Sequence, residues 1–177
     1  MDWSKAKTII IIALLVTNLL MGGFYLSGYR EDLQQRRLAA ESAVRYAEQR
    51  GVSVSAELPV DQKKLPVLFV SFNYDGGGEV HTHKGLPVEA SGDLDAEILP
   101  ESEGDTDGLL IAASKALVKL IDGFEGSVPQ GLDIEKVSLV YWVDTSLSSE
   151  SALEDTAIPA WKFESGWNCY YIEAFAE

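Results

Sequence analysis

The chain has 177 residues and a formal net charge of −14, because 28 acidic residues outweigh 14 basic ones. A chain this acidic repels nucleic acid and anionic lipid, so neither is an expected partner. Its single cysteine, Cys169, excludes an intrachain disulfide and a zinc site built from thiolates, and we expect it to be a buried free thiol.

An uncharged apolar stretch runs from Thr8 to Tyr29. About 20 apolar residues cross the hydrocarbon core of a bilayer, and inside lipid the backbone satisfies its own hydrogen bonds only as a helix. The stretch is longer than the apolar core of a secretory signal peptide and lacks a small-residue cleavage site. It therefore predicts a single transmembrane helix that remains as an anchor.

Residues 1–7 are expected to form a cytoplasmic tail, because the tail is short and carries Lys5 and Lys7 beside the helix. The rest of the chain then lies outside the cell. Residues 30–50 are charged, alanine-rich helix formers that either continue the membrane helix as a stalk or form the first helix of the next domain. Residues 51–177 are expected to be one extracellular α+β regulatory domain.

The apolar stretch carries polar or small residues near its middle. Thr17 lies four residues after Ala13, and Gly22 lies four residues after Asn18. Residues at this spacing lie along a helix surface, where small side chains let a second helix approach and an asparagine can bond across the contact. Thr17, Asn18 and Gly22 are therefore the candidate contacts with a partner helix.

The first half of the domain reads as strands separated by turns. Alternation over residues 51–56 predicts a short half-buried strand, and the branched and aromatic residues 65–74 predict a longer one. Asp75-Gly76-Gly77-Gly78 indicates a turn, after which residues 79–84 are expected to return as the second strand of a hairpin.

That return strand contains both histidines of the chain. Glu79, His81 and His83 would share one face of a strand and could hold a transition metal with an open position. A pH-sensing histidine is another interpretation. We favour a plain exposed hairpin, because no further ligands stand at the usual spacings.

The second half of the domain begins with a polar, acidic stretch at residues 85–108, which we expect to be a long surface loop with a possible edge strand. Residues 109–121 have apolar positions on one helical face and predict a helix. Asp107 is its expected N-cap and Gly123 its expected end.

The chain then returns to strands. Residues 134–144 predict a buried strand, residues 144–156 a loop, and residues 158–164 and 168–175 a closing hairpin around Ser165-Gly166. An antiparallel sheet with packed helices buries both kinds of apolar face. The expected fold class is therefore α+β, with one N-terminal transmembrane helix before an antiparallel sheet domain.

Both ends of the chain resemble one known family. The opening, MDWSKAKTIIIIALLVTNLL, resembles the start of the YycI family of membrane-anchored regulatory proteins. The ending resembles that family in a Pro-x-Trp strand and a Tyr-Tyr-Ile strand, and it is also similar to the closing hairpin of PepSY-like domains. Pro159, Trp161, Tyr170 and Tyr171 are the signature residues of this hairpin, and we expect its aromatic residues to pack in the core.

The resemblance implies a regulatory function without catalysis. Proteins of this family, with their sister YycH, lie beside the sensor histidine kinase WalK, also called YycG, in the cell membrane of Gram-positive bacteria. They adjust a two-component system that governs cell-wall homeostasis. By this resemblance the partners are a WalK/YycG-type kinase and a YycH-type protein, and neither catalytic residues nor a cofactor are expected.

The residues themselves agree with that implication. The sequence has no G-x-S-x-G elbow, no phosphate-binding P-loop and no H-E-x-x-H motif, and its two histidines and one cysteine leave few nucleophile–base pairs. Three functions stay open: a regulator of a membrane kinase, a PepSY-like extracytoplasmic binding module for a protease or envelope ligand, and a metal-dependent envelope enzyme built on Glu79, His81 and His83.

Overall fold

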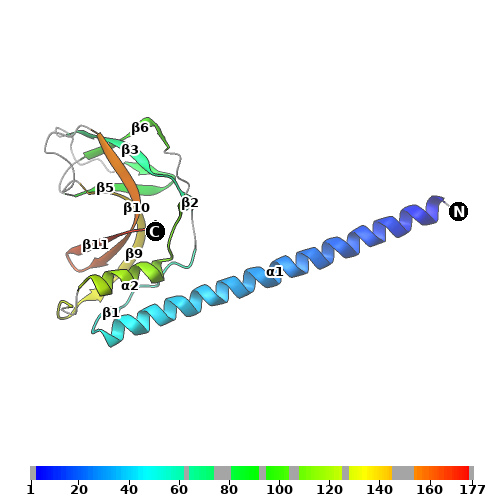
Figure 1. Cartoon of the computed structure of the whole chain (residues 1–177), viewed down its shortest axis with the longest axis horizontal. Coiled ribbons are helices and arrows are strands. Elements are labelled where there is room, and N and C mark those ends of the chain that lie inside the picture. The colour runs from blue at the N-terminus through cyan, green and yellow to red at the C-terminus, as the bar shows by residue number, and fades with distance from the viewer. Residues whose placement is uncertain are drawn as a thin grey trace. The chain divides into compact units, whose positions relative to one another are not determined.

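The computed structural model describes residues 3–61, 64–73, 81–91, 95–103, 108–124, 128–144 and 154–175. Its elements, in chain order, are α1 (Trp3–Gln49), β1 (Ser53–Val54), β2 (Lys64–Leu65), β3 (Leu68–Asn73), β4 (Thr82–His83), β5 (Leu86–Ala90), β6 (Asp95–Glu103), β7 (Gly108–Leu109), α2 (Ala113–Gly123), β8 (Asp133–Ile134), β9 (Lys136–Val143), β10 (Glu154–Ser165) and β11 (Asn168–Glu173). They make a mixed α+β protein with a long apolar N-terminal helix and a β-sheet domain (Figure 1). The chain divides into two compact units, Met1–Ala39 and Ala40–Glu177.

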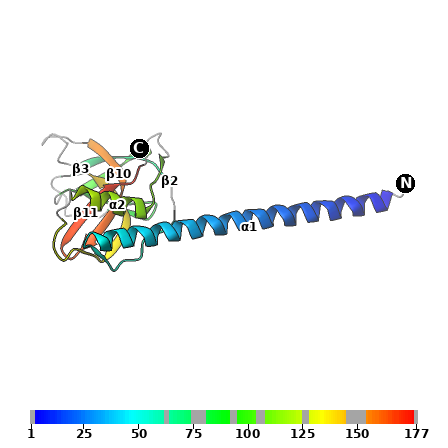
Figure 2. The same cartoon turned by 60° about the horizontal axis from the view of Figure 1, so that its bottom comes forward.

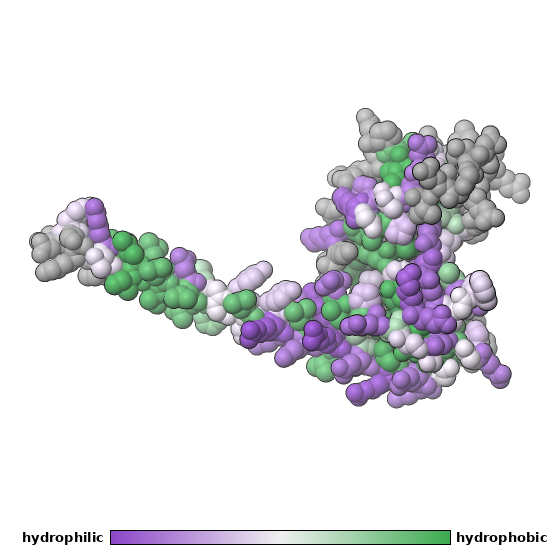
Figure 3. All heavy atoms as spheres, turned by 180° about the vertical axis from the view of Figure 1, so that it is seen from behind, coloured by the Kyte–Doolittle hydropathy of each residue, from purple (hydrophilic) through white to green (hydrophobic). Residues whose placement is uncertain are grey.

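The N-terminal helix is one continuous element. α1 runs from Trp3 to Gln49, so the segments 8–29 and 30–50 belong to a single helix. No proline interrupts it, and an apolar sequence passes directly into charged, alanine-rich helix formers (Figure 3). The helix is long and apolar enough to cross a membrane, a property that secretory signal sequences near an N-terminus share.

The domain is organised around β10. This strand pairs with β9 along one side, while β3 pairs with its first residues and β11 with its last residues along the other side. The strand order of the seven-stranded sheet is β4-β5-β9-β10-β3-β6, with β11 attached to β10. The sequence predicted a loop up to residue 156, but β10 already begins at Glu154, because β3 supplies a pairing partner there.

The sequence predicts an antiparallel sheet, but the observed sheet also contains a parallel pair of strands. β5 runs parallel to β9, and the small pair β1 and β8 is parallel too. Parallel neighbours need a long crossover connection, and α2 lies in the connection between β5 and β9. The α+β fold class is confirmed, whereas the exclusively antiparallel arrangement is wrong.

Helix α2 packs against the part of the sheet that contains β11, and the last turns of α1 lie beside α2 (Figures 1 and 2). The last turns of α1 bury Ala43 and Ala47, and the Tyr46 hydroxyl donates a 2.5 Å hydrogen bond to Asp122 near the end of α2. α2 buries one apolar face, made of Ala113, Ala116, Leu117, Leu120 and Ile121. Residues 30–49 thus continue the apolar helix, and their last turns, from Ala40 onward, also belong to the domain.

The predicted hairpin of residues 65–74 and 79–84 is wrong. Residues 64–73 form β2 and β3, and β3 pairs with β6 and β10, not with the segment that follows it. β4 pairs instead with β5, inside the stretch 85–108 that the sequence marked as a loop and that also contains β6. The turn Asp75–Gly78 and Glu79 lie outside the described residues.

The predicted helix at residues 109–121 begins too early. α2 starts at Ala113 after an extended N-cap residue, Ala112, and Phe124 is its C-cap, so Gly123 is inside the helix. Leu109 pairs with β2, and Leu110 forms a bridge with Phe175. Strand pairing in the folded domain therefore overrides the local helical pattern of these leucines, and the expected N-cap, Asp107, lies outside the described residues.

Candidate functional site

The polar residues of the apolar stretch differ in how they are satisfied. The Thr17 hydroxyl donates a 2.9 Å hydrogen bond to the Ala13 carbonyl one turn earlier in α1. The exposed Asn18 side-chain amide has no hydrogen bond to any other described residue, and beyond the adjacent residues and the surrounding helix backbone no atom lies within 4 Å of the position a Cβ would take on Gly22. The Thr17 hydroxyl is thus hydrogen-bonded within its own helix, whereas the Asn18 side-chain amide has no hydrogen-bond partner among the described residues.

The three candidate residues also lie on two neighbouring lines of the helix surface. Ala13 and Thr17 make one line, and Asn18 and Gly22 make the next, because consecutive helical residues point about 100° apart. Asn18 and Gly22 therefore combine a hydrogen-bonding group with a place for close approach. This pair is the candidate helix-contact site.

Three of the four signature residues of the closing hairpin pack in the core of the domain. Pro159 is fully buried, and Trp161 is 3% exposed and donates a 2.9 Å hydrogen bond from Nε1 to the Ile111 carbonyl. The half-buried Tyr170 ring meets the Phe124 ring edge-on at 5.6 Å. The expected core packing of the aromatic residues is confirmed for Trp161 and for Tyr170, which is partly buried against the core.

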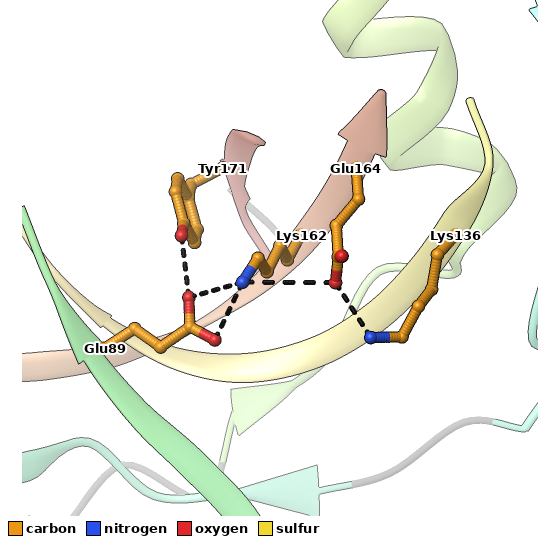
Figure 4. A network of polar contacts seen from close by, with 5 residues as sticks. All are labelled: Glu89, Lys136, Lys162, Glu164 and Tyr171. Atoms are coloured by element: carbon orange, nitrogen blue, oxygen red, sulfur yellow. Dashed lines mark hydrogen bonds and ion pairs between the residues drawn. The ribbon is translucent and has the colours of Figure 1, made fainter. Parts of the chain in front are cut away.

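The fourth signature residue, Tyr171, lies on the opposite face of the sheet. Cross-strand neighbours share a face, and Tyr171 of β11 stands opposite Lys162 of β10. Both meet Glu89 of β5: the Lys162 ammonium donates to its two carboxylate oxygens at 3.0 and 2.9 Å, and the Tyr171 hydroxyl donates to it at 2.6 Å (Figure 4). We call Glu89, Lys162 and Tyr171 the outer-face cluster.

The outer-face cluster continues into a second ion pair. Glu164 lies 3.9 Å from the Lys162 ammonium and accepts a 3.0 Å hydrogen bond from Lys136 (Figure 4). The Lys162 and Glu89 side chains are only 16% and 23% exposed, whereas Lys136 is 65% exposed. The strong interactions therefore belong to the inner pair, since exposed ion pairs are screened by water.

An aromatic stack covers one side of the outer-face cluster. The Trp142 and Tyr171 rings lie 3.6 Å apart at an interplanar angle of 12°. They come from β9 and β11, on either side of β10, and the small residue of β10 between them on this face is Ala160. The small side chain leaves room for the two rings to meet, so Trp142 covers one face of the Tyr171 ring.

The electrostatic environment of the outer-face cluster favours the protonated forms of Tyr171 and Lys162. Burial raises the pKa of Tyr171, and the hydrogen bond to the Glu89 carboxylate raises it further. Burial lowers the pKa of Lys162, but the Glu89 carboxylate outweighs this and the net pKa is raised. A tyrosine that acts as a base at neutral pH needs a lowered pKa, so the cluster suits structure and recognition better than proton transfer.

The histidines do not gather a metal-binding set among the described residues. No group of three histidine, cysteine, aspartate or glutamate side chains in that part of the chain lies close enough to hold a metal ion. His83 instead packs its ring edge-on against Tyr141, with the ring centroids 5.8 Å apart. The third ligand of that hypothesis, Glu79, lies outside the described residues.

Sequence reasoning missed two features near the closing hairpin. Cys169 is exposed, not buried as expected, because it stands on the outer face opposite Glu164. Glu89 falls in the stretch for which the sequence predicts a surface loop with a possible edge strand, although the alternation of Leu86, Val88 and Ala90 indicates a strand at this place.

Comparisons of the chain with protein-family models, with curated proteins and with solved structures find no significant match. Function is therefore inferred from the sites above and from the resemblance at the two ends of the sequence.

Proposed function

We propose that this chain is a non-catalytic, membrane-anchored regulator of a WalK/YycG-type sensor histidine kinase, which acts together with a YycH-type protein. The apolar part of α1 is the single-pass anchor, with the N-terminus in the cytoplasm and the β-sheet domain outside the cell. The pathway it serves is the two-component control of cell-wall homeostasis.

The observation that carries this proposal is the unsatisfied amide of Asn18. Lipid offers an amide no hydrogen-bonding partner, and polar groups within a membrane helix usually face another protein segment. Gly22, one turn further along the same line of α1, lets a second helix come close. A membrane-spanning helix of the kinase or of the YycH-type protein would supply both needs.

Regulation requires that the contact favour one state of the kinase. A helix that packed equally well against both states would change nothing, however tightly it bound. An asparagine bonded across the contact contributes about 1 kcal/mol, which corresponds to roughly a fivefold shift between two kinase states if the bond forms in only one of them.

The test is a mild-detergent purification of the full-length chain from its native membrane, with the kinase detected in the eluate. Asn18→Leu is expected to reduce the recovered kinase about fivefold, because it replaces the side-chain amide with an apolar side chain of similar size. Thr17→Val is the matched control: its hydroxyl is already bonded to Ala13, so recovery is expected to be unchanged. Equal recovery with both variants would count against the helix contact.

The PepSY-like binding module remains the second candidate, and the partly shielded outer-face cluster favours it. A half-buried lysine–glutamate pair beside stacked aromatic rings offers both charge and apolar surface to a ligand. A module of this kind would act through the domain alone. Replacing the apolar part of α1 with an unrelated apolar helix would then leave its activity unchanged.

A further inference from the structure

The closing hairpin ends the sheet with an open edge. β11 pairs with β10 on one side, and no other strand in the described part of the chain pairs with residues 168–173 on the other side. Only after the strand ends does Phe175 meet Leu110 in an isolated bridge. β11 therefore forms a margin of the domain beside β10 (Figures 1 and 2).

The register of the hairpin shows which backbone groups face outward. The Ala174 N–H donates to the Pro159 carbonyl at 2.9 Å, which fixes the phase of the antiparallel ladder. Because alternate residues face the partner strand, Tyr170 and Ile172 bond toward β10. The N–H and C=O groups of Cys169, Tyr171 and Glu173 then point away from the sheet.

This edge lacks most of the features that usually prevent strand pairing. Proteins protect exposed edges with proline, lysine, bulges or very short strands. β11 has six residues in continuous register with β10, and its sequence NCYYIE contains neither proline nor lysine. An edge with three outward-facing pairs of donors and acceptors is suited to bind an extended segment as an additional strand.

A fully exposed tryptophan stands at one end of the same edge. Trp167 occupies the second position of the two-residue turn between β10 and β11, where Gly166 has φ +56°. A glycine of positive φ at the first position is typical of a tight type II′ hairpin turn, so the indole is presented on a rigid support. Tryptophan is among the residues that most often dominate binding energy at interfaces.

The charge of the chain decides which occupant suits this edge. A second copy would bring together two chains that each carry a net charge of −14. Anionic lipid is disfavoured for the same reason. Glu173 is exposed at the far end of β11 and adds a negative charge to the edge itself. A basic segment is the complementary partner.

We infer that the free edge of β11 binds an extended, basic segment of a partner protein by strand addition, with Trp167 as its side-chain anchor. The backbone of Cys169, Tyr171 and Glu173 supplies the ladder, and these residues together with Trp167 are the hairpin edge. This inference does not rest on the kinase proposal, because it concerns the outer domain and holds for any partner that carries such a segment.

The test uses the full-length protein in neutral detergent and hydrogen exchange resolved by residue. The probe is an end-blocked eight-residue peptide that alternates lysine and valine, and its matched control alternates glutamate and valine. The lysine peptide is expected to slow exchange at Cys169, Tyr171 and Glu173 by about tenfold or more, because their N–H groups gain partners. Tyr170 and Ile172, already bonded to β10, should not change, and the glutamate peptide should have no effect.

Two variants link that protection to the hairpin edge. Cys169→Pro removes one outward N–H at a position where an edge strand tolerates proline, and it should abolish the protection, whereas Cys169→Ala keeps the N–H and the protection. Trp167→Ala should weaken peptide binding about tenfold without changing the exchange of the free protein. Trp167→Ala carries the test if Cys169→Pro does not fold.

Several results would overturn the inference. One is the absence of protection with the lysine peptide, and another is equal loss with Cys169→Pro and Cys169→Ala. Protection of β11 that rises with protein concentration, without peptide, would assign the edge to a second copy. A blue shift of Trp167 fluorescence on phosphatidylcholine vesicles, absent in Trp167→Ala, would assign the tryptophan to lipid.

Discussion

The apolar half of α1 and the β-sheet domain satisfy their polar groups in opposite ways. In the domain, Lys162 and Tyr171 are half-buried and both bond to Glu89. In the helix, the Asn18 amide is exposed and meets no bonding group elsewhere in the described chain. The domain therefore supplies its own partners, whereas the helix depends on what surrounds it.

The same contrast holds for apolar side chains. The domain buries large residues such as Tyr141, Phe163 and Trp161 in one core, while residues such as Leu19 and Phe24 of α1 are exposed. Exposed apolar surface of this extent is unfavourable in water and favourable in a bilayer. The apolar half of α1 therefore exposes side chains that water disfavours, as a membrane-spanning helix or a signal sequence does.

The largest expected effect comes from breaking the domain core. Trp161→Ala removes a buried indole and its hydrogen bond to Ile111, and it should lower the free energy of unfolding by about 3–5 kcal/mol. Urea unfolding of the full-length protein in detergent, followed by near-ultraviolet circular dichroism, measures this. Trp167→Ala, at the fully exposed turn, should stay within about 0.5 kcal/mol of the parent. Similar urea midpoints for the two variants would refute the assignment of Trp161 to the core.

A smaller effect is expected when the Glu89 carboxylate of the domain loses its cation and, like the Asn18 amide, is left without that partner. Lys162→Met leaves Glu89 partly buried without its cation and should cost about 1–3 kcal/mol, less than for a fully buried pair. Lys136→Met breaks the exposed pair with Glu164 and should change stability by at most about 0.5 kcal/mol. If Lys136→Met proved as damaging as Lys162→Met, burial would not be what distinguishes the two pairs.

Alkaline pH should weaken the outer-face cluster more gently. Unfolded tyrosine loses its proton near pH 10.0, whereas the raised pKa of Tyr171 keeps the folded side chain protonated above that pH. The folded state then binds more protons, so its stability is fully present below about pH 10 and falls as the pH rises further; Lys162 acts in the same sense. Urea midpoints at pH 8, 9.5 and 11 should fall less steeply in Tyr171→Phe than in the parent. Parallel slopes would show that Tyr171 does not contribute.

The sequence predicts those parts of the fold that local patterns determine. The charge-free run from Thr8 to Tyr29 predicts the apolar helix, and alternation predicts β9 and the hairpin of β10 and β11. These patterns are read correctly because their own side chains carry the periodicity of the element.

Long-range pairing could not be predicted in the same way. Leu109 and Leu110 fit a helical face, yet Leu109 pairs with β2 and Leu110 bridges to Phe175. In the same way, β5 pairs in parallel with a strand some fifty residues later, at Tyr141 to Val143. No local sequence pattern identifies the strand that pairs at that separation. Pro87 also lowers the strand propensity of residues 86–90, so the sequence does not indicate that Glu89 belongs to a central strand.

The same distinction between local patterns and long-range pairing applies to the candidate sites. Trp161 was read correctly as a core residue, because its aromatic character and its alternation with Lys162 are local. The outer-face cluster joins Glu89 to Lys162, and only the folded sheet brings these two residues together. The asymmetry between Thr17 and Asn18 also needed the structure, since both look equally polar in sequence.

The most direct test of the proposed regulation replaces residues 8–29 of the full-length chain with an unrelated apolar helix of equal length. The level of phosphorylated response regulator is measured in cells that make equal amounts of the parent or the exchanged chain. If α1 contacts the kinase, the exchange abolishes the effect on phosphorylation while the urea midpoint of the outer domain stays the same. Unchanged phosphorylation with the exchanged helix would contradict the account and assign the activity to the domain alone.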